Sequence, residues 1–494
     1  MDGYDPNLMI VRSEGVTLAE RYLQSLCDHS FLSLWSYPGL YRYKKENGKG
    51  DGKELCDVLV VCGDDILIFS DKSCAFPDSG DLKVDWCRWF RKAVWESAAQ
   101  TWGAERWIRT FPNLIFLDRA CTKPFPLRLP SPDKMRVHHV LAAHNVSDCI
   151  AQHYSGSSPS LMFNSELAGR DHFDQSRCIP FNIGWLDKDR PFVHVLDDHS
   201  LTVILGALDT ITDFVKYLRA KEVLLVSLRD SGRRFMYYGE EDLLAFYLFN
   251  TKDDEHYFDV PDVADVPASD GMCVQEGEWR RLIENPKFQA GQEQRLVSYF
   301  WDGVIERLTK YIAYNNKRGL TLADRESALR FLARENRIGR QTLATVLIEM
   351  LKITEHGCDR RSVVKARDPD APYYAFFLYD RRPGQSDQDY RESRAGLLED
   401  FCFIAKVMHP DARYIVGFAT ETGEDSPIRS EDLIAIDVRN WTDEDQVYWQ
   451  SEQDRTGVLT RSKMTELWTT EFPDPQDGNT LVAGLEKLRS RDEK

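Results

Sequence analysis

Hydrophobic and polar positions near the start of the chain predict a helix followed by paired strands. Residues 17–29 (TLAERYLQSLCDH) place leucines and a tyrosine at helical spacing, and Thr17 is suited to cap that helix. Apolar runs at 55–62 and 66–69 meet at a short Gly-Asp-Asp turn, which predicts an antiparallel hairpin. Alternating aromatic and leucine residues at 31–43 predict a strand or bent hairpin edge before it.

A long amphipathic helix is predicted next. Residues 84–110 carry tryptophan, phenylalanine and alanine on one face, with basic residues between them. Residues 113–118 (NLIFLD) form a short apolar run, which predicts a strand buried on both faces in a parallel pairing, and residues 137–143 are suited to extend the sheet. The predicted order up to residue 120 is α-β-β-β-α-β.

Later patterns predict further α/β and helical regions. A strand is expected at 192–196, a helical pattern dominates from about 276 to 352, and strands at 373–379, 413–418 and 433–438 surround a helix. We therefore predict a multidomain α/β protein with four regions, namely 1–155, 156–272 (a middle α/β segment that could extend the first domain), 273–365 (helical) and 366–494 (a small C-terminal α/β domain).

Composition narrows the class of protein. The 494 residues contain no apolar run of membrane-spanning length and no basic-then-apolar start, so we expect a cytoplasmic protein without a membrane partner. The 11 cysteines are scattered without a CxxC pair, which is typical of a reducing compartment. The net charge is −17, but residues 1–150 hold 19 basic against 20 acidic residues, so the acidity lies downstream.

Charged residues mark the margins of the predicted hairpin. Glu54 and Asp57 stand at the start of its first strand, and Asp71 and Lys72 at the end of its second strand. Carboxylates gathered on neighbouring strands repel one another unless a cation lies among them, and oxygen ligands suit Mg²⁺ or Mn²⁺. A metal held in this way, with an ammonium group beside it, is suited to phosphodiester hydrolysis.

The α-β-β-β-α-β order, the ExxD on the second strand and the lysine ending the third resemble the PD-(D/E)xK nuclease superfamily, in particular its nuclease-related and restriction-endonuclease-like branches. The resemblance covers residues 14–120. It implies a restriction-endonuclease-like core, Mg²⁺ or Mn²⁺ as cofactor, a nucleic acid (DNA before RNA) as substrate, and a place in restriction or antiphage defence. It also implies site residues: Glu20 as the helical glutamate, Asp57 as the metal-binding aspartate, Lys72 as the lysine that positions water, and Glu54 as an accessory acid.

One position departs from the family pattern. The family has an acid two residues before the lysine, where this chain has Ser70, and the acid is at Asp71, which a regular strand turns to the other face. A bulge turns Asp71 inward, or Ser70 serves as a neutral ligand while another acid completes the site, or the site no longer cuts. On the following helix, Glu96 and Gln100 share one face and are candidates to complete the site.

Further expectations concern binding partners and an alternative function. Arg88, Arg91 and Lys92 are candidates for contacts with a nucleic-acid backbone, and an arginine series at 334, 337 and 340 predicts either a phosphate-contacting stripe or an exposed helix face. A catalytically degenerate protein that binds nucleic acid or acts as a scaffold is the alternative to a nuclease. The acidic downstream regions are suited to bind a partner protein or a second copy of the chain.

Overall fold

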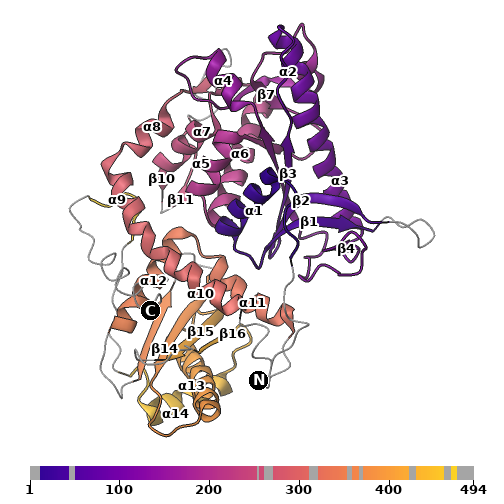
Figure 1. Ribbon diagram of the computed structural model, residues 1–494. Coiled ribbons are helices and arrows are strands. Elements are labelled where there is room, and N and C mark those ends of the chain that lie inside the picture. Colours follow the sequence, from indigo (N-terminus) through magenta and orange to yellow (C-terminus); the bar gives the residue numbers. More distant parts are fainter. Residues whose placement is uncertain are drawn as a thin grey trace. The chain divides into compact units, whose positions relative to one another are not determined.

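The computed structural model describes residues 12–43, 51–252, 255–260, 271–310, 321–352, 359–365, 371–421, 430–460 and 469–474. The chain divides into two compact units. One spans residues 10–286, and the other contains residues 287–494. The protein is therefore a multidomain α/β protein with several sheets (Figure 1).

The unit of residues 10–286 is built on a six-stranded mixed sheet with the order β4-β1-β2-β3-β5-β8. Strands β1, β2 and β3 form an antiparallel meander, β5 pairs in parallel with β3, and β8 pairs in parallel with β5. Two of these strands, β5 and β8, are almost wholly buried although they carry histidines, as is expected of parallel strands covered on both faces. The strands are β1 (Ser36–Arg42), β2 (Lys53–Cys62), β3 (Asp65–Ser73), β4 (Ile115–Phe116), β5 (Arg136–His144) and β8 (Val193–Asp197).

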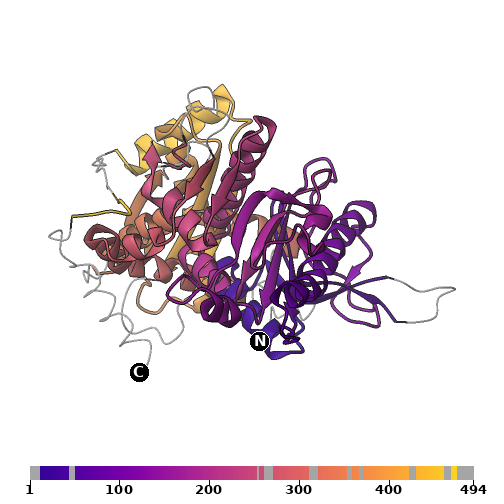
Figure 2. The ribbon, with the colours of Figure 1, turned by 90° about the horizontal axis from the view of Figure 1, so that it is seen from above.

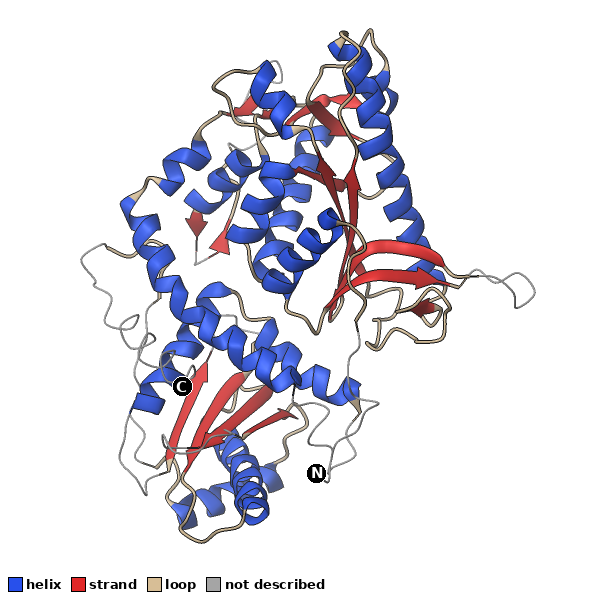
Figure 3. Cartoon of the chain, in the orientation of Figure 1, coloured by secondary structure: helices blue, strands red, loops and turns tan. Residues whose placement is uncertain are grey.

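Helices cover both faces of this sheet (Figures 1 and 3). On one face lie α1 (Leu18–Phe31), α5 (Asp198–Ala207) and α6 (Ile211–Asp230), where Phe31 and Phe214 pack against Phe69 of β3. The other face is covered by α2 (Leu82–Phe90), a π-helical turn (Arg91–Trp95) and α3 (Glu96–Thr110). The predicted helices near 17–29 and 84–110 are confirmed, and the apolar face of the second is buried.

The prediction that residues 113–118 form a strand in a parallel pairing is wrong. Only Ile115 and Phe116 form a strand, β4, which lies at the sheet edge antiparallel to β1. The run is too short to cross the sheet, because Asp118 closes a turn by accepting hydrogen bonds from the backbone N–H groups of Thr122 and Lys123. The strand that follows the helix and lies parallel to β3 is β5 instead.

A second, four-stranded sheet with the order β12-β9-β6-β7 lies in the same unit. Its buried face joins the apolar core beneath α2 and α3. The remaining elements of this unit are α4 (Ser147–His153), β6 (Met162–Ala168), a 3-10 turn (Gly169–Phe173), β7 (Asn182–Trp185), β9 (Phe235–Tyr237), α7 (Glu240–Phe249), β10 (Thr251–Lys252), β11 (Glu255–His256), β12 (Met272–Val274) and α8 (Glu278–Ile283).

The unit of residues 287–494 contains a four-stranded sheet with the order β13-β14-β15-β16, in which only β14 and β15 are parallel. The predicted strands near 373, 413 and 433 are confirmed. The elements are α9 (Pro286–Arg295, beginning at the boundary), α10 (Tyr299–Lys310), α11 (Leu322–Ala333), α12 (Arg337–Lys352), β13 (Arg360–Lys365), β14 (Tyr373–Tyr379), α13 (Asp387–Met408), β15 (Tyr414–Glu421), β16 (Glu431–Asp437) and α14 (Asp443–Thr456).

Two arginines of the series predicted as an exposed or phosphate-contacting stripe are buried instead. Arg337 is 5% and Arg340 0% exposed, and their guanidinium groups lie 2.8 and 2.7 Å from the two carboxylate oxygens of Asp302. They join α12 to α10 and are not available to a phosphate. Among the described residues, no helix is long and apolar enough to cross a membrane.

Candidate active site

The candidate site lies where β2 and β3 separate. These strands pair from Cys62 and Asp65 as far as Val58 and Phe69. Beyond that point β2 continues along β1, and β3 continues along β5. In Figure 1, β1 and β2 run away from β3 as a projecting hairpin, and Figure 2 shows this hairpin from above.

Asp57 occupies the fork. Its Oδ2 accepts a hydrogen bond from the backbone N–H of Asp71 at 2.7 Å, so a side chain contacts β3 just beyond the last ladder pair. Ser70 lies opposite Asp57 in the continued register, and Lys72 shares the face of Ser70. These three positions are therefore on the side of the sheet covered by α3.

Asp71 points to the opposite side of the sheet. The pairing of β3 with β5 is unbroken from Asp65 to Ser73, so no bulge interrupts β3, and the possibility that a bulge turns Asp71 towards Lys72 is wrong. The carboxylate of Asp71 instead meets His144 at the end of β5, with an Oδ1–Nε2 distance of 2.8 Å. Of the alternatives that the sequence leaves open, a neutral Ser70 beside the lysine and a site without cleavage remain.

A bulge does occur in β2. The register against β1 shifts by one residue, since Leu40 lies opposite Cys56 and Tyr41 opposite Glu54. Residues three apart on a regular strand point to opposite faces, but the extra residue, Leu55, returns Glu54 to the side of Asp57. The ExxD spacing thus places both carboxylates on one face because the strand is irregular.

Negative charge is concentrated at this fork. Burial raises the pKa of Asp57 to about 7; the hydrogen bond from the Asp71 backbone opposes this shift, and the carboxylates of Glu54, Asp71 and Glu20 add to it. The pKa of Glu54 is also raised, first by burial and then by Glu20, while the ammonium of Lys72 acts in the opposite direction. One lysine therefore faces several acids, and an additional cation would stabilise their ionised forms.

Glu20 also caps the start of helix α1. It is the acid of a capping box at the start of α1, where its Oε2 accepts hydrogen bonds from the backbone N–H groups of Val16 (2.7 Å) and Thr17 (3.4 Å). Its carboxylate is still close enough to raise the pKa of both Glu54 and Asp57. A metal ligand at this position would have to share its carboxylate with the helix cap.

The structure does not connect the other predicted residues to the fork. Glu96 and Gln100 are exposed on a flank of α3, beside its buried stripe, and neither makes a hydrogen bond or ion pair with another described residue. Arg88, Arg91 and Lys92 are exposed on α2 and the π-helical turn that follows it. Their proposed contacts with nucleic acid stay predictions.

Among the described residues, no group of three or more acidic, histidine or cysteine side chains is arranged to hold a metal by itself. Glu54 and Asp57 offer two carboxylates on one face. Mg²⁺ keeps several water ligands and is commonly held by one or two carboxylates together with substrate phosphates, so this pair fits such an ion without a closed protein cage.

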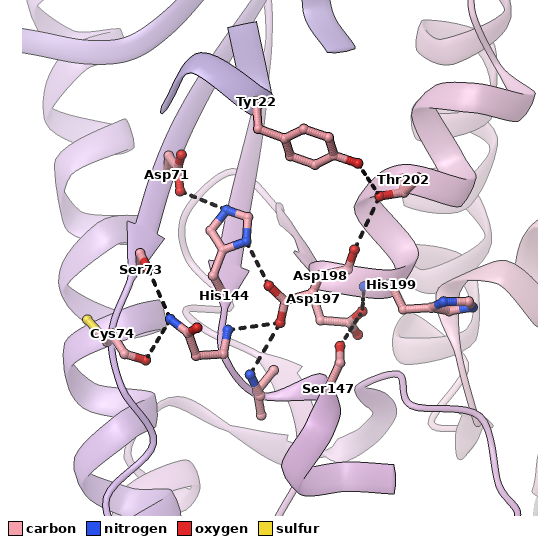
Figure 4. A network of polar contacts seen from close by, with 12 residues as sticks. Tyr22, Asp71, Ser73, Cys74, His144, Ser147, Asp197, Asp198, His199 and Thr202 are labelled. Atoms are coloured by element: carbon pink, nitrogen blue, oxygen red, sulfur yellow. Dashed lines mark hydrogen bonds and ion pairs between the residues drawn. The ribbon is translucent and has the colours of Figure 1, made fainter. Parts of the chain in front are cut away.

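A second polar cluster, which the sequence did not reveal, adjoins the fork (Figure 4). His144 lies between Asp71 and Asp198, 2.8 Å from a carboxylate oxygen of each. Although burial opposes it, these two acids raise the pKa of His144 to about 9, and the histidine in turn lowers the pKa of Asp198. The imidazolium therefore joins the ends of β3 and β5 to the first turn of α5.

Further hydrogen bonds hold the same strand ends. Asp198 accepts from the backbone N–H groups of Asn145 (2.8 Å) and Val146 (3.3 Å), and the side-chain amide of Asn145 donates to Ser73. The cluster fixes the end of β3 that carries Lys72. Recognising it requires the β3–β5 register, because His144 and Asp71 are 73 residues apart in sequence.

Comparison of the chain with protein-family models, with curated proteins and with solved structures found no match in any of the three.

Proposed function

We propose that the unit of residues 10–286 is a metal-dependent nuclease of the PD-(D/E)xK type. The single observation that carries this proposal is the fork at Asp57, where Glu54, Asp57 and Lys72 meet at the separating ends of β2 and β3 and the pKa of Asp57 is raised to about 7. Element order adds support, since α1, the β1–β2–β3 meander, α3 and the parallel strand β5 follow one another as in a restriction-endonuclease-like core.

Each residue has a proposed role. Glu54 and Asp57 would hold Mg²⁺ or Mn²⁺, and the metal when bound would neutralise charge on the phosphate and lower the pKa of a water. Lys72 would donate hydrogen bonds that orient the attacking water. As the water oxygen bonds to phosphorus, the P–O bond to the sugar breaks, the water gives up a proton to solvent, and the departing sugar oxygen takes up a proton from solvent. Asp71 contributes its backbone N–H to Asp57, and through His144 it fixes the strand that carries Lys72. DNA as substrate and a role in restriction or antiphage defence are part of the proposal and come from the family resemblance.

The decisive experiment is a cleavage assay on the full chain. Linear, circular and single-stranded DNA and RNA are incubated with protein and with Mg²⁺, Mn²⁺ or a chelator. We expect products only with metal, and we expect Lys72→Ala to reduce the rate by at least about a hundredfold. The matched control is Lys188→Ala, since Lys188 is exposed and makes no hydrogen bond or ion pair with another described residue. Equal rates for the two lysine variants would show that Lys72 is not at the site.

One observation favours a second function. Ser70 stands where the family has an acid, and the unbroken register of β3 keeps Asp71 on the other face. A protein of this kind would bind nucleic acid without cutting it. The same samples test this alternative in a gel-shift assay, in which binding would persist with chelator while no product appears with any metal.

A further inference from the structure

A cavity of about 280 Å³ opens on the second sheet, away from the fork residues. Strand alternation explains its position. Phe163, Ile183 and Phe235 of the β6, β7 and β9 strands are buried in the core, so their neighbours in sequence point to the opposite face. That face lines the cavity with Asn164, Asn182, Met162, Met236 and Tyr238, while Tyr154, Ser157 and Ser158 come from the segment after α4.

Two buried amides present one donor and one acceptor to this cavity. Asn164 and Asn182 are each 4% exposed. The Oδ1 of Asn164 accepts a hydrogen bond from the backbone N–H of Glu166 (3.0 Å), and the Nδ2 of Asn182 donates to the carbonyl oxygen of Pro180 (3.1 Å). These bonds fix how both amides are turned. They leave Nδ2 of Asn164 as a donor and Oδ1 of Asn182 as an acceptor, neither with a hydrogen-bond partner among the described residues.

The walls favour a flat and polarisable ligand. Tyr154 and Tyr238 contribute aromatic rings, and Met162 and Met236 contribute thioethers, which are side chains that stack well on a heterocycle. The two amide groups among these walls can make hydrogen bonds to a ligand in place of those they make to water.

Charge disfavours a phosphate as the group recognised. Among the described residues that line the cavity there is no lysine or arginine, and the one charged residue is Glu276, whose Oε1 accepts a hydrogen bond from the backbone N–H of Ser158 at 2.5 Å. A carboxylate at the rim repels anions and accepts hydrogen bonds from hydroxyl groups. The ligand that fits is therefore neutral, planar and rich in nitrogen, with room for a sugar beside it.

We propose that this cavity binds a nucleobase-like ring that accepts a hydrogen bond from Asn164 and donates one to Asn182. The ring is that of a free nucleoside or of an unstacked base in a nucleic-acid strand, since both present the same edge. The site is built from residues other than those of the fork, so it does not depend on the proposed nuclease function.

Calorimetric titration of the full chain, in chelator so that nothing is cleaved, tests the proposal. The probes are adenosine, guanosine, cytidine and thymidine, with ribose and inorganic phosphate as controls. We expect at least one nucleoside to bind saturably, and neither control to bind. Ser157→Trp, which fills the mouth from a loop, and Asn164→Leu, which removes the donor, should each weaken binding at least about tenfold. The matched control Ser79→Trp places the same side chain at an exposed position outside the cavity lining and should change affinity by less than about threefold.

A second arm separates the two sources of the ring. Short single-stranded oligonucleotides are compared with abasic strands of equal length, for the unmodified chain and for Ser157→Trp. Binding of free nucleosides that Ser157→Trp weakens supports a small-molecule ligand. Binding of oligonucleotides alone, lost with abasic strands and with Ser157→Trp, supports an unstacked base. If no nucleoside or oligonucleotide distinguishes Ser157→Trp from the unmodified chain, or if ribose or phosphate alone competes, the proposal is wrong. Asp57→Asn should leave the affinities for free nucleosides unchanged, so a failure here is distinct from a failure of the nuclease assay.

Discussion

The strand β3 has acidic clusters at both of its ends, and the two differ in how their charge is matched. At its start, Asp65 lies 2.8 Å from Arg136, in contact with Arg219 and 3.5 Å from His138. The basic partners outweigh burial and lower the pKa of Asp65 far below its usual range. At the fork, by contrast, the pKa of Asp57 is raised to about 7 because burial and neighbouring acids outweigh the favourable contacts.

The two acids differ in the basic side chains that surround them. The fold supplies two arginines and a histidine for Asp65, which sits at the start of β3 beside the parallel strand β5. Among the described residues no basic side chain pairs with Asp57 in this way, although the residue is partly buried. Retaining an ill-matched carboxylate lowers stability, and such groups concentrate at sites where a ligand or metal completes them. We infer that the charge missing at the fork comes from outside the chain.

The largest expected effect is on cleavage. Asp57→Asn removes the carboxylate from the fork while keeping an acceptor for the Asp71 N–H, and we expect the metal-dependent rate to fall by at least about a thousandfold. Asp78→Asn, at an exposed position, is the matched control and should cut normally. The measurement is single-turnover cleavage of DNA in Mg²⁺. Cleavage that survives Asp57→Asn would place the active site elsewhere.

The next effect is on stability at the other end of β3. Asp65→Asn leaves two arginines with half-exposed side chains without their buried carboxylate, and we expect the free energy of unfolding to fall by roughly 2 kcal/mol. Its neighbour Asp64 is more exposed and lies 3.7 Å from Arg136, so Asp64→Asn should cost less than about 0.5 kcal/mol. Urea denaturation followed by circular dichroism measures both. If Asp65→Asn and Asp64→Asn lowered the free energy of unfolding by similar amounts, the basic partners of Asp65 would not stabilise it.

A third effect follows from the raised pKa at the fork. Because Asp57 titrates near pH 7 in the folded protein and near its ordinary value when unfolded, the folded state binds more protons between these limits, and stability falls as pH rises from about 4 to 7. Asp57→Asn removes this pH-dependent loss of stability, because asparagine does not titrate. At pH 8 its melting temperature should therefore exceed that of the unmodified chain by about 3–6 °C, and the difference should vanish near pH 4.

Metal provides the control for that measurement. At pH 8, Mg²⁺ should raise the melting temperature of the unmodified chain and of Asp78→Asn, and it should have little effect on Asp57→Asn. A pH-independent difference between Asp57→Asn and the unmodified chain would show that Asp57 titrates normally.

The local parts of this fold could be predicted from sequence, and the parts that depend on distant pairing could not. Thr17, the helix it caps and the hairpin at 55–69 follow from spacing and turn residues within a short window. The bulge at Leu55 depends on the partner strand β1, so the reason that Glu54 joins Asp57 was not visible. Apolar residues at 113–118 indicated a strand, but its edge position depended on which strand it met.

Charged residues were misjudged in the same way. Arg337 and Arg340 follow a helical spacing that is typical of exposed faces. The aspartate that pairs with them, Asp302, is more than thirty residues away in sequence, on α10. Asp71 was correctly placed opposite to Lys72 by strand alternation, but its partner His144 arrives from β5. Sequence reasoning thus located the acids and missed what neutralises them.

The smallest expected effect concerns His144, where the charges are matched by a group that titrates. Its pKa is raised to about 9 by Asp71 and Asp198, so its ion pairs stabilise the fold fully below about pH 6.5, and this contribution is lost as pH rises through 9. His144→Gln should lower the free energy of unfolding by about 1–2 kcal/mol at pH 6 and by almost nothing at pH 10. His153→Gln, at an exposed histidine without an ion pair among the described residues, should show no such pH dependence. If His144→Gln lowered the free energy of unfolding equally at both pH values, the histidine would act through packing alone. Asp57 at the fork would then be the residue of this comparison whose charge changes with pH.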